Sequence, residues 1–205
     1  MSRLPSEKFG TTAVNSQIDD LTSVTHFGSL FREPFVSPEG RVVLSRFDET
    51  DICDEYLGWL NDRTLMRYSN QRFIAHTRDS VKRYLESLVA AKAVQLSIKD
   101  TKGALVGTMT AHPNFFHSTC DVGILVGSRP AAGKGFGSEA WRALFEHLED
   151  SKIFRKITAG TNSKNIPMVK IFQSSGMVPD GVKRRHEVVE GIETDLVFYA
   201  KFRDQ

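Results

Sequence analysis

Three glycines spaced by two, Gly133, Gly135 and Gly137, stand between an apolar stretch and an amphipathic segment. The apolar stretch, residues 122–126, has the length of a buried strand, and the segment that begins at Phe136 has apolar side chains at helical spacing. Glycines have no Cβ, so successive N–H groups can converge on an anion, and a helix N-terminus adds unpaired donors. The segment therefore predicts either a phosphate-binding loop or a turn that only tightens a strand–helix junction.

The spacing of the glycines excludes one familiar phosphate-binding motif and argues against a second. A P-loop needs four residues between its glycines and a Ser or Thr after its Lys, but five residues separate Gly127 from Gly133, and Gly135 follows Lys134. A dinucleotide-binding fingerprint needs its third glycine one residue later than Gly137, in an early βαβ unit. Here the glycine loop follows several segments whose alternating polarity predicts antiparallel strands, which argues against a dinucleotide-binding loop.

Residue periodicity elsewhere predicts a sheet interrupted by helices. The two strands on either side of residues 100–103 alternate in polarity, and this turn predicts a hairpin. A second hairpin is expected at the turn Glu190-Gly191. The expected strands cover residues 42–44, 94–99, 105–111, 122–126, 156–160, 182–189 and 195–202. The order predicts the α/β (α+β) class with mixed strand directions.

Four segments have the apolar spacing of helices. The first is expected to begin after Asp48 and the second after Thr77, because Asp and Thr accept hydrogen bonds from a first helical turn. The third follows the glycines, and the fourth covers residues 166–175, with Pro167 in its first turn. The expected buried faces of the first three are Ile52, Tyr56, Trp59 and Leu60; Val81, Tyr84, Leu85 and Leu88; and Phe136, Ala140, Leu144, Phe145 and Leu148.

Residues 1–40 are rich in Ser, Thr, Gly and Pro and have neither helical nor strand periodicity over a useful length. We therefore expect an irregular N-terminal extension over residues 1–40, followed by one folded domain over residues 41–205. The total length of 205 residues is enough for one sizeable core.

Overall charge excludes some classes of partner. The chain has 27 basic and 25 acidic residues, a formal net charge of +2, so it lacks the field that marks a nucleic-acid or membrane binder. No stretch approaches the roughly 18 apolar residues of a membrane span. Cys53 and Cys120 stand far apart without zinc-ligand spacing, so neither a disulfide framework nor a metal site is predicted. We expect a cytoplasmic protein.

Residues 132–137 resemble the acetyl-CoA motif of the GNAT N-acetyltransferases, Gln/Arg-x-x-Gly-x-Gly/Ala. Gly135 and Gly137 stand at the two small positions, and Ala132 stands where the family usually has Gln or Arg. The resemblance covers most of residues 41–203 and is closest to the RimJ/RimL-like subgroup. It implies a GNAT-type mixed, mostly antiparallel central sheet flanked by helices, and an enzyme that uses acetyl-CoA as co-substrate without a metal.

The resemblance also implies which residues contact acetyl-CoA. The strand at 124–126 would pair with the pantetheine arm, and the amides of the glycine loop would bind the pyrophosphate. Asn165 would contact the thiol arm, although it also stands where an ordinary helix N-cap would. The implied cofactor-binding residues are Ile124, Leu125, Val126, Ala132, Gly133, Lys134, Gly135, Phe136, Gly137, Ser138, Asn165 and Phe172.

The catalytic groups depart from the pattern of the family. Many relatives have a Tyr acid where this chain has Phe172, and RimL-like enzymes have a Ser where it has Met168. A thiolate could leave unaided or through water, because a thiol pKa near about 8.5 makes protonation a modest demand. Glu187 matches the base of RimL-like enzymes, unless it is a solvated strand carboxylate. Asp121 and His117 are the competing bases.

The loop between the first two helices is the candidate acceptor site. Tyr68, Arg72 and His76 could bind the acceptor together with Asn70 and Gln71, or the whole segment could be an ordinary solvated loop.

The segment at residues 56–62, followed by Arg67-Tyr68, resembles acyltransferases of amino-sugar and surface-polysaccharide pathways. The acceptor is therefore expected to be a small amine, such as a nucleotide-linked amino sugar. The alternatives are a protein N-terminal amino group, or a catalytically silent acyl-CoA-binding module. A homodimer formed by exchange of strands through the C-terminal hairpin is possible, but nothing in the sequence requires one.

Overall fold

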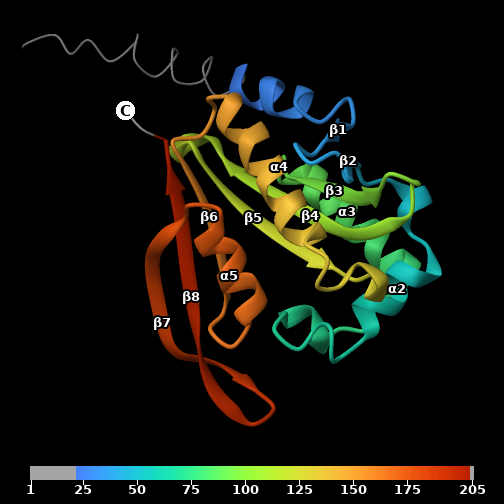
Figure 1. Cartoon of the computed structure of the whole chain (residues 1–205), viewed down its shortest axis with the longest axis vertical. Coiled ribbons are helices and arrows are strands. Elements are labelled where there is room, and N and C mark those ends of the chain that lie inside the picture. Colours follow the sequence, from blue (N-terminus) through green and yellow to red (C-terminus); the bar gives the residue numbers. More distant parts are fainter. Residues whose placement is uncertain (1–21, 204–205) are drawn as a thin grey trace, which may run out of the picture.

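The computed structural model describes residues 22–203, which form one eight-stranded sheet with helices on both faces (Figure 1). The order of the strands in the sheet is β1-β2-β3-β4-β5-β6-β8-β7. The strands are β1 (Phe35–Val36), β2 (Val42–Arg46), β3 (Val94–Asp100), β4 (Leu105–Asn114), β5 (Thr119–Val126), β6 (Lys156–Asn162), β7 (Val178–Val189) and β8 (Ile192–Phe202). The helices are one over residues 22–29, α2 (Asp54–Asn61), α3 (Arg78–Ala90), α4 (Phe136–Asp150) and α5 (Ile166–Ser174).

The sheet confirms the expected mixed, mostly antiparallel class. Among the described strands, only β5 and β6 pair in parallel, and all the other neighbours are antiparallel. Both predicted hairpins are present, as β3–β4 and β7–β8. In the second, Glu190 and Gly191 have φ values of 51° and 81°. Two successive positive φ angles are typical of the two-residue turn whose twist matches that of a hairpin.

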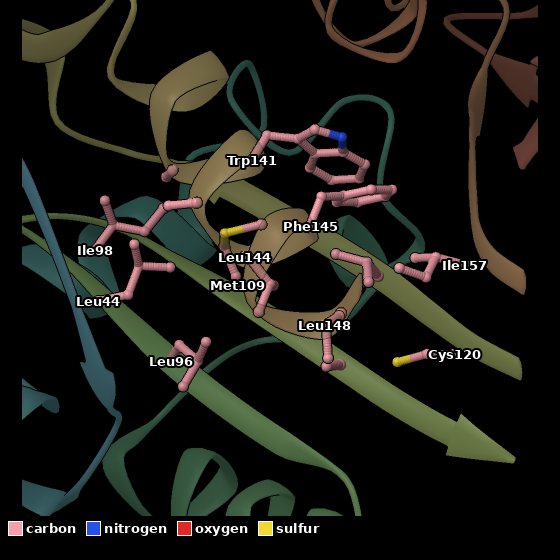
Figure 2. Packing of buried hydrophobic residues seen from close by; sticks show 14 of the residues in the cluster. Leu44, Leu96, Ile98, Met109, Cys120, Trp141, Leu144, Phe145, Leu148 and Ile157 are labelled. Carbon is pink, nitrogen blue, oxygen red and sulfur yellow. The ribbon is translucent and has the colours of Figure 1, made fainter. Parts of the chain in front are cut away.

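The core lies mainly between the sheet and α4. Four large side chains of α4 are at most 2% exposed: Trp141, Leu144, Phe145 and Leu148. Figure 2 shows them packed against residues of the central strands, among them Leu44, Leu96, Ile98 and Met109. A second cluster, formed by α2, α3 and the segments next to them, packs on the other face around Trp59 and Val81.

The first predicted helix start is wrong. Asp48 caps a single 3-10 turn, Glu49–Asp51, and α2 begins only at Asp54, after Cys53. Asp48 and Asp51 satisfy each other's backbone N–H groups, which closes the turn, and Asp51 also accepts a hydrogen bond from Ser97 of β3. The chain is thereby anchored to the sheet before the helix can begin. The predicted start of α3 is confirmed, because Thr77 caps it in a capping box.

The predicted buried face of α3 is too wide. Val81 and Leu88 are buried, but Tyr84 is 38% exposed, so the ring lies at the edge of the helix–sheet contact. Residues seven apart face the sheet more directly than those between them.

The irregular structure expected over residues 1–40 is wrong for the part that the structure describes. Residues 22–29 form a helix, and β1 pairs with β2. Phe27 and Phe31 are buried in the main core, and Phe27 makes edge-to-face contacts with Phe115 and Phe154. The isolated phenylalanines of this stretch thus attach it to the sheet. Residues 1–21 lie outside the described part, and the domain boundary at residue 41 stays a prediction.

Candidate active site

β5 and β6 lie side by side only at the start of each strand (Figure 1). Their three parallel pairs end at Asp121 opposite Thr158. Beyond this point residues 122–126 pair with β4 alone, whereas β6 continues to Asn162 alongside β8. Within the described chain, the β6-facing N–H and C=O groups of residues 122–126 therefore have no strand partner. We call this divergence of the two strands the splay. Unpaired strand edges bind extended, amide-bearing ligands.

The glycine loop, residues 132–135, ends where α4 begins. Gly133 and Gly135 have φ values of 72° and 85°, a conformation that favours glycine. A Cβ at Gly133 would meet no atom within 4 Å, so this part of the loop faces open space. No side chain caps α4 within the described part of the chain. The N–H groups of its first turn are therefore available to an anion such as a pyrophosphate.

The third glycine has a packing role. A Cβ on Gly137 would lie 3.1 Å from Cγ2 of Val126 and 3.6 Å from Cδ1 of Ile171. Glycine at this position lets the first turn of α4 approach the end of β5 closely. The end of the splay and the N-terminus of α4 therefore form one continuous surface.

The loop is supported from behind by a buried carboxylate. Glu139 is 1% exposed, and its Oε2 accepts a hydrogen bond of 2.8 Å from Nε of Arg41. Its Oε1 accepts from the backbone N of Arg41, at 3.0 Å, and from the hydroxyl of Ser37. Burial raises the pKa of Glu139, but the hydrogen bonds from Ser37 and Arg41 outweigh it, so the pKa is lowered. Nη1 of Arg41 also donates to the carbonyl of Lys134, at 3.2 Å, within the glycine loop.

Glu187 lies opposite the splay, held by a buried asparagine. Nδ2 of Asn162, which is fully buried at the end of β6, donates to Oε2 of Glu187 and to Oγ1 of Thr194, each at 2.7 Å. Continuing the β5–β6 register by four residues puts Asn162 level with Leu125. The carboxylate is half-buried. Nearby Arg185 pairs with Glu193 and not with Glu187. Asn162 bonds only to Oε2 of Glu187, so Oε1 is available to a ligand.

Asp121 and His117 lie at the closed end of the splay. Oδ2 of Asp121 accepts a hydrogen bond of 2.9 Å from Oγ1 of Thr158, where the two strands are still paired. Along β6 this is about 13 Å from Asn162, at roughly 3.3 Å per residue. Desolvation raises the pKa of Asp121, and the hydrogen bond from Thr158 partly offsets this. His117 precedes β5 in a 3-10 turn. The structure therefore does not bring these two residues together with Glu187.

Comparison with known proteins decides the family. The family described as acetyltransferase (GNAT) domain matches residues 41–178, more than half of the chain. The chain belongs to the GNAT family. It is therefore an N-acetyltransferase, and the resemblance of the glycine motif is confirmed at the level of the family. No curated protein sequence matches the chain significantly.

Solved GNAT structures share the fold at low sequence identity. RimL, a ribosomal L7/L12 α-N-protein acetyltransferase in complex with coenzyme A, has a TM-score of 0.72 at 15% identity, over 83% of this chain and 98% of that one. A spermidine N-acetyltransferase from Vibrio cholerae, with CoA and spermine, gives 0.70 at 16%, over 79% and 95%. The microcin C7 self-immunity acetyltransferase MccE, with acetyl-CoA and AMP, gives 0.68 at 17%, over 80% and 93%.

In this GNAT protein the position of the usual Tyr acid is closed off. Phe172 is fully buried between Trp141 and Tyr199, with ring centroids 5.5 Å and 5.1 Å away. It offers no exposed surface to a thiol arm, and its contact with the cofactor stays a prediction. Met168 packs against the main core. Asn165 occupies the N-cap position of α5, but its side chain makes no capping bond and donates to Oγ1 of Thr161, at 3.0 Å.

The expected acceptor loop of the GNAT domain contacts the C-terminal hairpin. Nη2 of Arg72 donates to the carbonyl of Val188, at 3.1 Å, next to Glu187. Nε2 of His76 contacts the carbonyl of Gln71, at 3.1 Å, so this ring is engaged within the loop. Tyr68 lies under the guanidinium of Arg67. Of the three expected acceptor residues, the geometry brings Arg72 next to the candidate base.

Three residues of this GNAT site were missed from the sequence. Arg41 and Glu139 meet across 98 residues, and no local pattern indicates such a pair. Asn162 ends a strand, where polar residues are common, and only its burial distinguishes it. Within residues 22–203 there is no cluster of His, Cys, Asp or Glu that could hold a metal ion, and no helix is long and apolar enough to cross a membrane.

Proposed function

We propose that this enzyme transfers the acetyl group of acetyl-CoA to the primary amine of a small molecule, such as a nucleotide-linked amino sugar, with Glu187 as general base. The observation that carries the proposal is the hydrogen bond from buried Asn162 to Glu187. It fixes the carboxylate level with the unpaired edge of β5, where the thioester of an extended pantetheine arm would end. A base is useful only within reach of the proton that it removes.

The binding of acetyl-CoA is assigned to groups whose chemistry fits it. Residues 122–126 offer unpaired backbone donors and acceptors to the amides of the pantetheine arm. The glycine loop and the uncapped start of α4 offer N–H groups and a positive dipole end to the pyrophosphate. Arg41, which is paired with Glu139, holds this loop through the carbonyl of Lys134. The solved RimL and MccE structures contain CoA and acetyl-CoA respectively, which supports this co-substrate.

The chemistry requires a neutral amine. Its nitrogen attacks the thioester carbon to form the new C–N bond, and its surplus proton passes to Glu187, directly or through a water. The C–S bond then breaks, and the thiolate leaves with the bonding electrons and takes a proton from water. No side-chain acid is needed, since a thiol pKa near about 8.5 makes the thiolate an adequate leaving group. This accounts for a phenylalanine at position 172 in an active enzyme.

A small acceptor is supported by the neighbours that act on or contain small molecules. The Vibrio cholerae structure contains spermine and the MccE structure contains AMP, whereas RimL acts on a protein. The acceptor loop and the end of α2 form a hollow of about 360 Å³, a volume suited to a small ligand.

The first test is a thermal-shift titration with acetyl-CoA on the natural protein and on Gly135→Asp. The added carboxylate would lie at the start of α4 and repel the pyrophosphate. Gly103→Asp is the matched control for backbone strain, because Gly103 also has a positive φ (82°) but lies in the β3–β4 turn. A Cβ on Gly103 would meet no atom within 4 Å, whereas a Cβ on Gly135 would lie 3.4 Å from Nη2 of Arg41. Stabilisation by acetyl-CoA should persist in the control and disappear in Gly135→Asp.

Release of free thiol with a panel of amines then tests for turnover. Absence of any thermal shift at millimolar acetyl-CoA would overturn the assignment of the cofactor site. Clear binding without thiol release for any amine would identify a silent acyl-CoA-binding module.

A further inference from the structure

A hollow on the acceptor side carries positive charge that no carboxylate balances. It lies between the end of α2 and the loop that follows, and we call it the arginine hollow. Its lining residues are Leu60, Asn61, Arg63, Arg72, Phe73, Ile74 and Ala75. Two of them are arginines and none is acidic. A binding site for a polyamine would have the opposite charge.

The two arginines are not neutralised by neighbouring side chains. Arg72 donates only to carbonyl oxygens, Ser69 O at 2.8 Å and Val188 O at 3.1 Å, and stacks on Phe73 with 4.2 Å to the ring centroid. Arg63 is exposed and has no hydrogen-bond or ion-pair partner among residues 22–203. The adjacent Asp62 is engaged elsewhere: its Oδ1 accepts hydrogen bonds from the N–H groups of Thr64 and Leu65, and its Oδ2 lies 3.5 Å from Nη2 of Arg129.

Some other arginines of this molecule are paired with a carboxylate. Arg41 pairs with Glu139, Arg78 with Asp54, and Arg142 with Glu39. What distinguishes Arg63 and Arg72 is that two guanidinium groups without a carboxylate partner line the same hollow, which suits an anionic oxygen group. A guanidinium fork matches phosphate or carboxylate geometry, and charged hydrogen bonds of this kind are strong.

The arginine hollow is next to the candidate base. Arg72 binds the carbonyl of Val188, and Val188 follows Glu187 in β7. A ligand whose anionic group contacts Arg63 and Arg72 would therefore have its other end near the carboxylate of Glu187. Phe73, which is 73% exposed, and Ile74, which is 54% exposed, add an apolar surface on which a flat ring can pack.

We propose that the acceptor is an amine that also bears a phosphate group, and that Arg63 and Arg72 bind this phosphate while the amine lies at Glu187. This inference rests on the proposed function, which it narrows: polyamines and neutral amines become poor acceptors. Arg63 is a specificity-determining residue in this assignment. It has no hydrogen-bond or ion-pair partner among residues 22–203, so its guanidinium is available to the ligand.

The test measures binding of a matched pair of probes by calorimetry to protein saturated with coenzyme A. The probes are adenosine 5′-monophosphate and adenosine, which differ only in the phosphate. Saturation with coenzyme A keeps both probes out of the nucleotide site of the cofactor. AMP is expected to bind about tenfold more tightly than adenosine, as for one or two charged hydrogen bonds. Spermidine should bind more weakly than AMP.

Arg63→Gln should remove most of the preference for AMP. Arg67→Gln is the matched control, because Arg67 is on the same loop but stacks on Tyr68, 4.8 Å away, and does not line the hollow. An equal affinity for AMP and adenosine, an unchanged preference in Arg63→Gln, or tighter binding of spermidine would each overturn the inference. Failure of coenzyme A itself to bind would instead overturn the proposed function, so the two outcomes are distinguishable.

Discussion

The proposed cofactor side and the proposed acceptor side of the site are built in different ways. The glycine loop is held by Arg41, whose partner Glu139 is almost fully buried and accepts several hydrogen bonds. The acceptor loop exposes Phe73 and Ile74, and Arg72 links it to the hairpin through one hydrogen bond to a carbonyl. Changing a buried charged group disturbs the core, whereas changing an exposed loop side chain seldom does.

This difference teaches how one fold can serve different acceptors. The solved neighbours share the fold with this chain at 15–17% identity, yet their names give a ribosomal protein, spermidine and microcin C7. A cofactor side fixed by internal interactions can stay constant while exposed loop residues are exchanged. The largest effects of mutation should then separate the two sides cleanly.

The largest expected effect belongs to the proposed base, Glu187. In Glu187→Gln, kcat should fall by about a hundredfold or more, the usual range for loss of a general base, while the affinity for acetyl-CoA stays unchanged. The glutamine can still accept the hydrogen bond of Asn162, so the site should keep its shape. The measurement is steady-state thiol release with the best amine of the panel, beside a thermal-shift titration with acetyl-CoA.

Glu193→Gln is the control for that variant. Glu193 is also a carboxylate of the C-terminal hairpin, but it pairs with Arg185 at the surface. Its loss should leave kcat within about twofold of the natural value, as for surface substitutions. If Glu187→Gln kept full activity, or weakened acetyl-CoA binding instead, the division between the two sides would be lost.

The next effect tests the cofactor side alone. Arg41→Gln leaves the buried carboxylate of Glu139 without its cation, which should lower the free energy of unfolding by about 2 kcal/mol; Arg41 is half exposed, so this lies below the range for a fully buried pair. The loop at Lys134 also loses its support, and the Kd for acetyl-CoA should rise about tenfold, or about 1.4 kcal/mol. Urea unfolding and calorimetry measure the two quantities.

Arg142→Gln provides the comparison, since Arg142 is on α4, the helix of Glu139, and pairs with Glu39 near the surface. It should change neither quantity beyond about 0.5 kcal/mol. Equal effects of the two arginine substitutions would mean that Arg41 has no special role in the glycine loop.

The sequence predicted what depends on local pattern. Alternating polarity and the Glu190-Gly191 turn predicted the hairpins, and three spaced glycines predicted an open loop before a helix. Thr77 was identified as a cap because its hydroxyl acts on the next few residues. Interactions of this range are visible in a short window of sequence.

What the sequence did not predict depends on distant contacts. Arg41 and Glu139 are ordinary charged residues until the fold brings β2 beside α4. The short helix over residues 22–29 is held by the burial of Phe27 and not by its own periodicity. Asp48 has a good capping side chain, but the turn that it closes with Asp51 is only a 3-10 turn, and Asp51 is tied to β3 through Ser97. Each miss is a tertiary contact that overrides a local preference.

The smallest expected effect is a pH dependence confined to the cofactor side. The folded pKa of Glu139 is below its unfolded value of about 4.5, since the hydrogen bonds from Ser37 and Arg41 favour the charged form. Its contribution to stability is therefore fully present above about pH 4.5 and is lost as the pH falls through the lower, folded pKa.

Urea unfolding of the natural protein and of Glu139→Gln measures this dependence. The difference between their free energies of unfolding should be largest near neutral pH and should shrink below about pH 4.5. Arg72→Lys on the acceptor side changes no carboxylate. Its free energy of unfolding should therefore differ from that of the natural protein by the same amount near neutral pH and at about pH 3. A difference for Glu139→Gln that stayed constant down to about pH 3 would mean that Glu139 supports the loop by packing alone.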